Sequence, residues 1–278
     1  MAALWDAGRQ IFSTFPEAVW AGILIGAGCS FLGVLVVLKR LVFIGATLSE
    51  VAGCGVAAAF FYHVHPFFGA VALTLAAVTI LAFSSEEKKV PRDSILATVF
   101  IFSSSLAVLL VAKSGFGLEE VKSLLYGDLI ITSAVDLKIL ALIVLPIMGL
   151  CFLFLRPIVY TFMDREEAKV LGIQVRFWEL FFYYALGILV SAASKLGGML
   201  LVFCYLVIPP MIGLLMTRRL GWAMVTAIFT AVFSTLLGFS YSYLHDLPTN
   251  QVIAVLSGLL LGLVGLGKGL FSIFPPRE

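Results

Sequence analysis

Charged residues are scarce in this chain of 278 residues, where Asp, Glu, Lys and Arg together make up only 12%. Soluble globular domains contain about 25% charged residues. The hydrophobic share is 62%, and the mean hydropathy is +1.12. A chain this short cannot hide so much apolar surface in its own core, so lipid must be the solvent for much of it. The composition excludes a soluble globular protein and predicts an all-α, polytopic transmembrane helical bundle.

Several functional signatures are also missing. The net charge of +2 is too small to suggest nucleic acid as a partner. The four cysteines lie inside apolar runs without CxxC or other zinc-finger spacing, which argues against a disulfide framework and a structural zinc site. No GxxxxGK(S/T) phosphate loop, HExxH motif or GxSxG motif is present. We therefore expect neither an ATPase nor an intramembrane enzyme.

Long apolar runs are what the sequence has in abundance. A spanning helix needs about 20 mostly apolar residues. Nine runs meet or approach that length: 17–38, 42–62, 66–83, 94–112, 137–155, 177–194, 198–216, 222–243 and 251–272. Some connections, such as "YHVHP" and "SKLG", are very short. One pair of runs could therefore form a single broken or re-entrant element, which would give eight spans instead of nine. We expect eight or nine spans in a single transmembrane domain over residues 1–278.

The basic residues predict the orientation of these spans. With the N-terminus outside, the inner loops hold most of the Lys and Arg residues, including the pairs at 39–40, 88–89 and 218–219. The positive-inside rule favours this arrangement. The N-terminal segment lacks the basic region and cleavage site of a signal peptide, so we expect the first span to stay in the mature chain. Two segments are too mixed to span, the outer segment 113–136 and the inner loop 156–176.

The inner loop contains "MDREEAKVLGI", a sequence typical of a short amphipathic helix. Asp164 is a good N-cap, and Glu166 and Glu167 lie in the first turn, where the helix dipole favours acidic residues. Gly172 can end the helix in a left-handed conformation. The pattern predicts a helix over about 164–172. It is either a helix lying on the lipid surface or a docking knob for a cytoplasmic partner.

Five segments resemble, in the same order, motifs of the permease subunits of ATP-binding-cassette importers for zinc, manganese and iron. The coupling helix of that family is similar to "DREEAKVLGI". Its usual G-D-A-L-S-H-A-x-L-P-G stretch has the place of "GATLSEVAGCG", and its outer L-F/Y-G-D/S segment resembles "LLYGDLI". Its G-x-L-L-V-x-A-L-L-V-I-P-A run resembles "GGMLLVFCYLVIPPMIGLLM", and its S-Y-x-x-D-L-P-S/T-G segment resembles "SYLHDLPTN". The resemblance covers about residues 17 to 265.

This resemblance implies a permease that imports a divalent transition metal, zinc, manganese or iron, and binds no permanent cofactor. A second copy of the chain, two cytoplasmic ATP-binding subunits and an extracytoplasmic solute-binding protein are the implied partners, in a bacterial cell membrane. ATP hydrolysis would reside on the partner subunits. The resemblance also implies which residues couple the permease to the ATP-binding subunits: Asp164, Arg165, Glu166, Glu167, Ala168, Leu171 and Gly172. Among these, Ala168 and Leu171 form a small apolar face.

Glu50 is the acid that lies well inside a predicted span. On insertion scales an Asp at mid-membrane costs about 2.5–3.5 kcal/mol, and such groups usually face a bundle interior or a water-filled path. Ala46, Glu50 and Cys54 share one helical stripe, and a stripe of small residues that includes Ser49 and Gly53 lies beside it. The family normally has Asp and His at positions 46 and 50, and Pro at position 54.

Two interpretations of this stripe follow. In the first, Glu50 is a transient ligand or gate on a metal pathway, with Cys54 as a second donor and Ser49 beside them. In the second, Glu50 is a packing group bonded to a neighbouring hydroxyl, and Cys54 is a small apolar residue. Carboxylate donors favour manganese or iron, whereas a thiol favours zinc.

Other candidates lie on the predicted outer side. The turn "YHVHP" carries His63 and His65, which are either metal ligands or ordinary interfacial histidines. His245 and Asp246 follow a later span, and Asp246 either caps the next helix or contacts the docking protein. Asp128 is a vestibule or capping residue. All five are candidates for the outer mouth or for contact with a binding protein.

Pro209 and Pro210 lie inside a predicted span and should break or kink it. Irregular backbone at that depth must be buried in protein or line a cavity, so the pair is either a hinge beside the pathway or a static kink. The alternative function is a self-sufficient secondary metal-ion transporter or channel. That function would favour more buried charge for ion coupling, and it would give the predicted helix over 164–172 no purpose.

Overall fold

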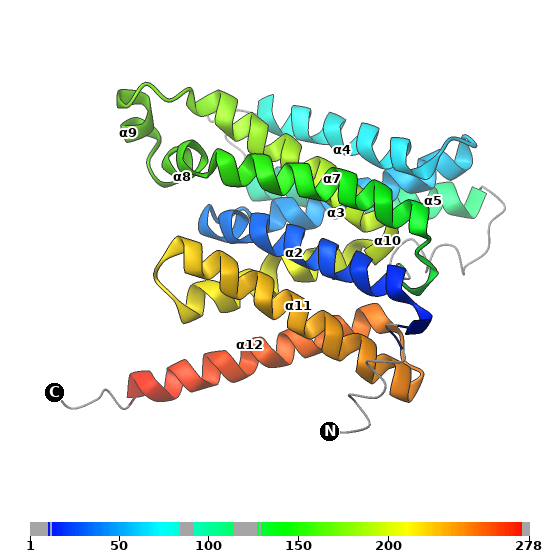
Figure 1. Ribbon diagram of the computed structural model, residues 1–278. Helices are drawn as coiled ribbons and strands as arrows, with labels where there is room; N and C mark the ends of the chain where they lie inside the picture. Colours follow the sequence, from blue (N-terminus) through cyan, green and yellow to red (C-terminus); the bar gives the residue numbers. More distant parts are fainter. Residues whose placement is uncertain (1–10, 12, 84–91, 114–126, 128, 274–278) are drawn as a thin grey trace.

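A computed structural model describes residues 11, 13–83, 92–113, 127 and 129–273 of the chain as one helical bundle (Figure 1). The long helices are α2 (Pro16–Leu38), α3 (Val42–Phe61), α4 (Pro66–Phe83), α5 (Arg92–Lys113), α7 (Ala134–Leu153), α10 (Val175–Met216), α11 (Leu220–His245) and α12 (Thr249–Ile273). The short ones are the 3-10 helix η1 (Leu129–Ile131), α8 (Leu155–Met163) and α9 (Arg165–Val170). Within those ranges no strand occurs, which confirms the all-α prediction.

Helix α10 reverses direction at Gly198. The helix has 42 residues, and the backbone at Gly198 is not helical, with φ 70° and ψ 167°. A straight helix of that length would measure about 63 Å, about twice the hydrocarbon core of a bilayer. Figure 1 instead shows both ends of α10 at the end of the bundle that carries α9. The runs predicted at 177–194 and 198–216 are therefore two antiparallel halves of α10.

The described helices give a smaller span count than the sequence did. By length and hydropathy, seven of them are long and apolar enough to cross a membrane, and α4 is a shorter apolar helix over Pro66–Ile80. The sequence predicted eight or nine. The difference arises because α10 counts once as a 42-residue helix and α4 falls below the length limit.

Helix α2 forms the centre of the bundle. Its buried residues extend from Ala18 to Val36, and it packs against α7, α10 and α11. On the other flank, α3 packs against α4, α5 and α10. The peripheral helices α5, α7 and α12 expose large apolar side chains such as Phe102, Leu142 and Leu263. This is the distribution expected of a bundle whose outer surface faces lipid.

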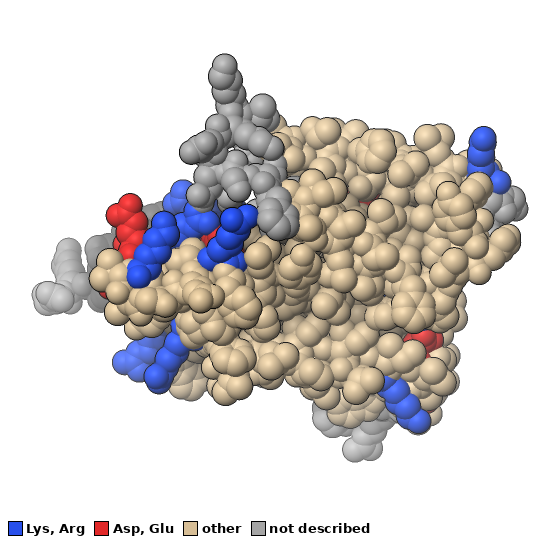
Figure 2. Space-filling view, turned by 90° about the horizontal axis from the view of Figure 1, so that it is seen from above, with Lys and Arg blue, Asp and Glu red and all other residues tan. Residues whose placement is uncertain are grey.

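The two ends of the bundle differ in charge. Figure 2 shows the Lys and Arg side chains concentrated at one end. The turns and short helices at the α9 end hold Lys39, Arg40, Arg156, Arg165, Lys169, Arg176, Arg218 and Arg219. The opposite end, where α2 begins, has fewer basic residues, among them Lys138 and Lys195. The structure of the described residues agrees with the predicted collection of basic loops on one side.

Pro209 and Pro210 do not break α10, and the predicted kink or hinge at this pair stays a prediction. The backbone is helical at both prolines, and the non-helical residue inside α10 is Gly198. A proline in a helix cannot donate a hydrogen bond to the carbonyl four residues earlier. The two prolines therefore deprive the carbonyls of Tyr205 and Leu206 of their helical donors.

Helix α2 packs against both carbonyls and supplies a donor to one of them. The Ser30 hydroxyl donates to the Tyr205 carbonyl oxygen at 3.2 Å. Gly33 brings the α2 backbone against the Leu206 carbonyl, since a Cβ atom at position 33 would lie 2.4 Å from that oxygen and 2.6 Å from Cγ of Pro210. Serine hydroxyls and close helix contacts are the usual way to satisfy such groups in a membrane. The two prolines thus create a docking surface for α2.

Glycines also close the end of the bundle opposite α9. Gly127 has a φ of 61°, and a Cβ atom there would lie 2.3 Å from the backbone nitrogen of Gly198. The side-chain amide of Asn250 in α12 donates to the Gly197 carbonyl at 3.0 Å. Gly127, the turn of α10 and the start of α12 therefore meet at the Gly197–Gly198 pair, and a side chain at position 127 would collide with the backbone there.

We predict that Gly33→Ala destabilises the protein. The added methyl group would collide with the Leu206 carbonyl and separate α2 from α10, and overpacking of this kind costs about 1–3 kcal/mol. Denaturant unfolding of the purified protein in detergent should show a loss of about that size. The control is Gly149→Ala in α7, where no atom lies within 4 Å of the new Cβ. Equal stabilities of the two variants would contradict the close α2–α10 contact.

Candidate functional site

Glu50 lies in the middle of α3, half-buried, on a helix that packs against α5. The hydroxyl of Ser104, a residue of α5, donates a hydrogen bond to its carboxyl group. The Oε2 atom of Glu50 is buried and has no hydrogen-bond partner among the described residues. A buried carboxylate oxygen without a donor is costly. The arrangement combines the bonded hydroxyl of the packing interpretation with one oxygen that a cation could use.

Cys54 lies one turn further along α3 than Glu50. It is buried in a small apolar cluster with Ala107 and Val111 of α5. In the part of the chain that the structure describes, no group of three or more His, Cys, Asp or Glu side chains is placed to hold a metal ion. The described residues of one chain therefore bring no complete ligand shell to Glu50.

The stripe of small residues on α3 makes the close helix contact that the sequence predicted. A Cβ atom on Gly53 would lie 2.5 Å from the sulfur of Met199, the residue that follows the turn of α10. Ser49 is buried, and its hydroxyl donates to the Gly45 carbonyl at 3.0 Å. Because this bond stays within α3, the position of the Ser49 hydroxyl agrees with the packing interpretation.

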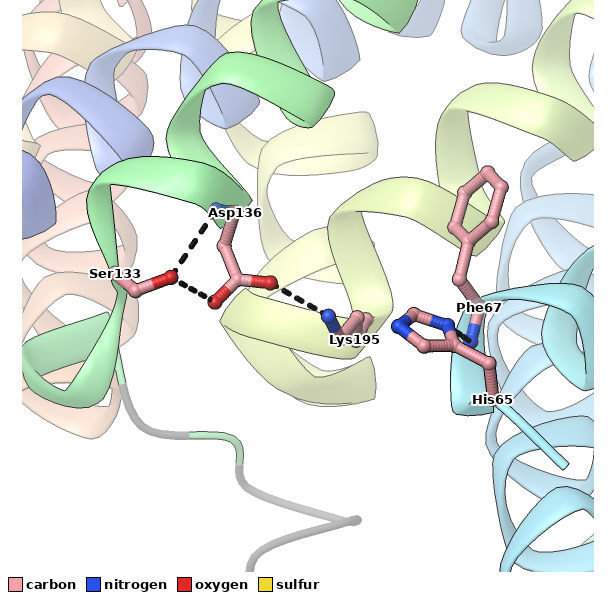
Figure 3. A network of polar contacts seen from close by, with 5 residues as sticks. All are labelled: His65, Phe67, Ser133, Asp136 and Lys195. Atoms are coloured by element: carbon pink, nitrogen blue, oxygen red, sulfur yellow. Dashed lines mark hydrogen bonds and ion pairs between the residues drawn. The ribbon is translucent and has the colours of Figure 1, made fainter. Parts of the chain in front are cut away.

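The predicted outer histidines lie in the turn between α3 and α4. His63 has a left-handed backbone with φ 55°. The Nδ1 atom of His65 accepts a hydrogen bond from the Phe67 backbone at 3.4 Å, near the start of α4 (Figure 3). No described third ligand joins the two histidines, so a metal site there stays a prediction.

An ion pair that the sequence analysis missed lies beside His65. The Lys195 ammonium is 2.6 Å from Oδ1 of Asp136, and the two side chains point toward each other (Figure 3). Both residues and His65 line a cavity of about 300 Å³ whose other lining residues are apolar. Ser133 caps α7 by accepting a hydrogen bond from the Asp136 backbone at 3.2 Å. The Ser-x-x-Asp spacing resembles a capping box and could have signalled this helix start.

The predicted cap of α12 by Asp246 is wrong. Helix α11 ends at His245, and Asp246 is its C-terminal cap with φ 49° and ψ 42°. Asp tolerates this left-handed conformation better than most residues. Helix α12 begins at Thr249, whose hydroxyl lies 2.8 Å from that of Ser242. Asp128, another predicted outer residue, lies outside the described residues.

At the opposite end, α9 has the predicted start and stop. The Asp164 carboxylate accepts hydrogen bonds from the backbone nitrogens of Glu166 and Glu167 at 2.9 and 3.0 Å. Gly172 is left-handed, with φ 75°. These observations confirm the N-cap and the terminating glycine.

The side chains of α9 divide into an inner and an outer set. Ala168 is fully buried, whereas Leu171 is 58% exposed, so the two do not share one buried face. Glu166 and Glu167 are exposed, and Val170 is 87% exposed. The helix therefore presents acidic and apolar side chains beyond the bundle.

Helix α8 was not predicted. The sequence analysis placed its residues in the inner loop, but the chain turns helical again after Phe154. Ile158 and Thr161 are buried, and Tyr160 and Met163 are exposed. That three-residue spacing of buried positions is a weak helical signal, which a window of nine residues makes hard to see.

Comparisons with known proteins find similarity over most of the chain. Residues 12–266 match one protein family, described as the ABC 3 transport family. The manganese transport system membrane protein MntC of Halalkalibacterium halodurans is 25% identical over 253 residues, covering 91% of this chain and 86% of that protein. The high-affinity zinc uptake system membrane protein ZnuB of Buchnera aphidicola is 24% identical over 249 residues, covering 89% and 95%. The solved structure of PsaBC from Streptococcus pneumoniae in complex with Fab shares the fold, with a TM-score of 0.84, 20% identity and 95% of both chains covered.

Proposed function

The chain belongs to the ABC 3 transport family, and from that premise we propose that it is the permease subunit of an importer of zinc, manganese or iron. As an ABC permease it is not itself an enzyme, and ATP is hydrolysed on a separate subunit. The observation that carries the proposal is α9, a capped helix that presents exposed acidic and apolar side chains at the basic end of a membrane bundle. The similarity to membrane proteins named for manganese and zinc transport supports the choice of cargo.

We propose nine membrane crossings with the N-terminus outside. Seven described helices are long enough to span, α4 adds one, and the reversal of α10 at Gly198 adds another. The concentration of basic residues at the α9 end supports a cytoplasmic position for that end. The start of α2, the His63–His65 turn and Asp246 then lie outside.

The proposed partners follow from this orientation. ATP-binding subunits would contact α9 on the cytoplasmic side, and a solute-binding protein would dock on the outer end near His63, His65, His245 and Asp246. A second copy of the permease is proposed because one described chain offers Glu50 no complete set of ligands. A pair of chains would bring a second Glu50 to the pathway.

Glu50 is the proposed point of contact with the metal in transit. Its buried, unbonded oxygen supports this role, and the neighbouring Ser104 hydroxyl adds a second oxygen donor. Oxygen donors suit manganese and iron, whereas participation of the Cys54 thiol would favour zinc. A site with so few ligands binds weakly, which suits a cargo that must be released.

We predict that uptake requires the ATPase partner and the acidic residues of α9. Proteoliposomes containing the permease, its ATP-binding subunits and binding protein should accumulate radiolabelled Mn²⁺ or Zn²⁺ when ATP is supplied. Removing an anchor residue from a protein interface typically weakens binding about tenfold, so Glu166→Ala with Glu167→Ala should reduce uptake and ATPase co-purification by about that factor. Glu17→Ala, at the other end of the bundle, is the control. Equal uptake by the permease alone would favour a self-sufficient transporter.

We predict that Glu50→Gln, which keeps the shape of the side chain and removes its charge, reduces metal uptake. Loss of a group that tunes a metal site typically costs about 10–100-fold, so Mn²⁺ uptake should fall by about that factor while the complex still assembles. Cys54→Ala is the matched comparison, and a selective loss of Zn²⁺ uptake there would identify the thiol as a donor. Unchanged uptake by Glu50→Gln would reduce Glu50 to a packing residue.

A further inference from the structure

Glu179 is a buried acid that the proposed pathway does not use. It lies in the second turn of α10 and is 9% exposed. Its position is at the α9 end of the bundle, far along the chain from Glu50. A carboxylate buried at such a place needs a partner of opposite charge.

The two oxygens of Glu179 bind two cations from different elements. Oε1 accepts a short hydrogen bond from the ammonium of Lys39, the residue that ends α2. Oε2 accepts one from Nη2 of Arg165, the first residue of α9, at 2.6 Å. The side chains of Glu179, Lys39 and Arg165 are 11%, 14% and 40% exposed. One carboxylate therefore joins α2, α9 and α10.

Aromatic rings cover the Lys39 side of this ion cluster. The Lys39 ammonium lies 4.0 Å from the ring centre of Phe162 in α8, and 5.8 Å from that of Tyr183 in α10. Phe162 packs edge-on against Phe182, with ring centres 4.9 Å apart. Charges in such surroundings interact more strongly than at an open surface, and the ring faces add an attraction for the cation.

The remaining contacts of α9 are few. The helix has six residues, and Ala168 is its buried residue. Apolar burial of one alanine side chain cannot hold a helix rigidly against a bundle. The Arg165–Glu179 ion pair thus adds a direct link between α9 and α10.

We propose that Glu179 is a positioning residue for transport, which locks the start of α9 to the inner ends of α2 and α10. This inference rests on the proposed role of α9 as the contact for the ATPase. When that partner displaces α9, the Glu179 cluster transmits the movement to α2 and α10. From there, Met199 of α10 contacts Gly53 of α3, which lies one turn from Glu50. Without the carboxylate, α9 can move while the pathway helices stay in place.

The first test measures the mobility of α9 in the permease alone. A nitroxide spin label attached through Val170→Cys, at an 87% exposed position, reports this mobility by electron paramagnetic resonance after the native cysteines are replaced by Ala. Glu179→Gln should sharpen the spectrum, and Lys39→Gln should do so to a smaller extent. The control is Arg40→Gln, next to Lys39 but exposed, which should leave the spectrum unchanged. Identical spectra for Glu179→Gln and the parent would overturn the proposal.

The second test uses the complete complex in proteoliposomes and measures metal ions imported per ATP hydrolysed. Coupling between sites is typically worth about 5–150-fold, so Glu179→Gln should lower this ratio about tenfold while ATP hydrolysis and assembly persist. Because Lys39 acts through Glu179, the double variant with Lys39→Gln should be no worse than Glu179→Gln alone. A merely structural residue would reduce the amount of complex and leave the ratio unchanged, which would overturn the proposal.

The two tests also separate this inference from the proposed function. If the parent complex shows no ATP-driven uptake but Glu179→Gln still frees the spin label, the proposed function fails while the positioning of α9 by Glu179 stands. If uptake is ATP-driven and the ratio survives Glu179→Gln, the function stands and the inference fails.

Discussion

A backbone carbonyl inside a bilayer has no water to bond, so every irregularity in a membrane helix must be satisfied by a neighbour. This constraint determines how α2 and α10 pack. Pro209 and Pro210 leave two carbonyls of α10 without helical donors; the Ser30 hydroxyl of α2 bonds one of them, and the backbone at Gly33 packs against the other. At the turn of α10, the Asn250 amide bonds the Gly197 carbonyl, and Gly127 packs closely against Gly198. The contact between these two helices gives the bundle its centre, and the reversal of α10 gives it two differently charged ends.

The need for polar partners also separates the buried Glu179 from the half-buried Glu50. Each carboxylate oxygen of Glu179 is paired with a cation, and an aromatic ring lies beside one of the two cations. Glu50 has one serine hydroxyl and one buried oxygen without a described partner. Both carboxylate oxygens of Glu179 have partners, whereas one oxygen of Glu50 has none among the described residues. This contrast favours cargo contact for Glu50 and mechanical support for Glu179.

Local chemistry was readable from the sequence. Apolar runs located the helices, basic pairs identified one end of the bundle, and Asp164 and Gly172 gave the bounds of α9. Features that depend on distant partners were not readable. The prolines looked like a break because the compensating Ser30 lies 175 residues from the Tyr205 carbonyl that it bonds. Asp246 looked like an N-cap, but α12 begins only at Thr249. Ser104, Lys195 and Glu179 act through side chains from other elements, which spacing along one segment cannot show.

In the proposed topology, α10 crosses the membrane twice around Gly198, and the basic end that carries α9 lies in the cytoplasm. The direct measurement is labelling of intact cells with a membrane-impermeant maleimide, in a protein whose native cysteines are replaced by Ala. We expect that Lys195→Cys, beside the turn, reacts from outside, whereas Lys169→Cys on α9 reacts only after the cells are opened. Reaction of both positions from the same side would contradict it.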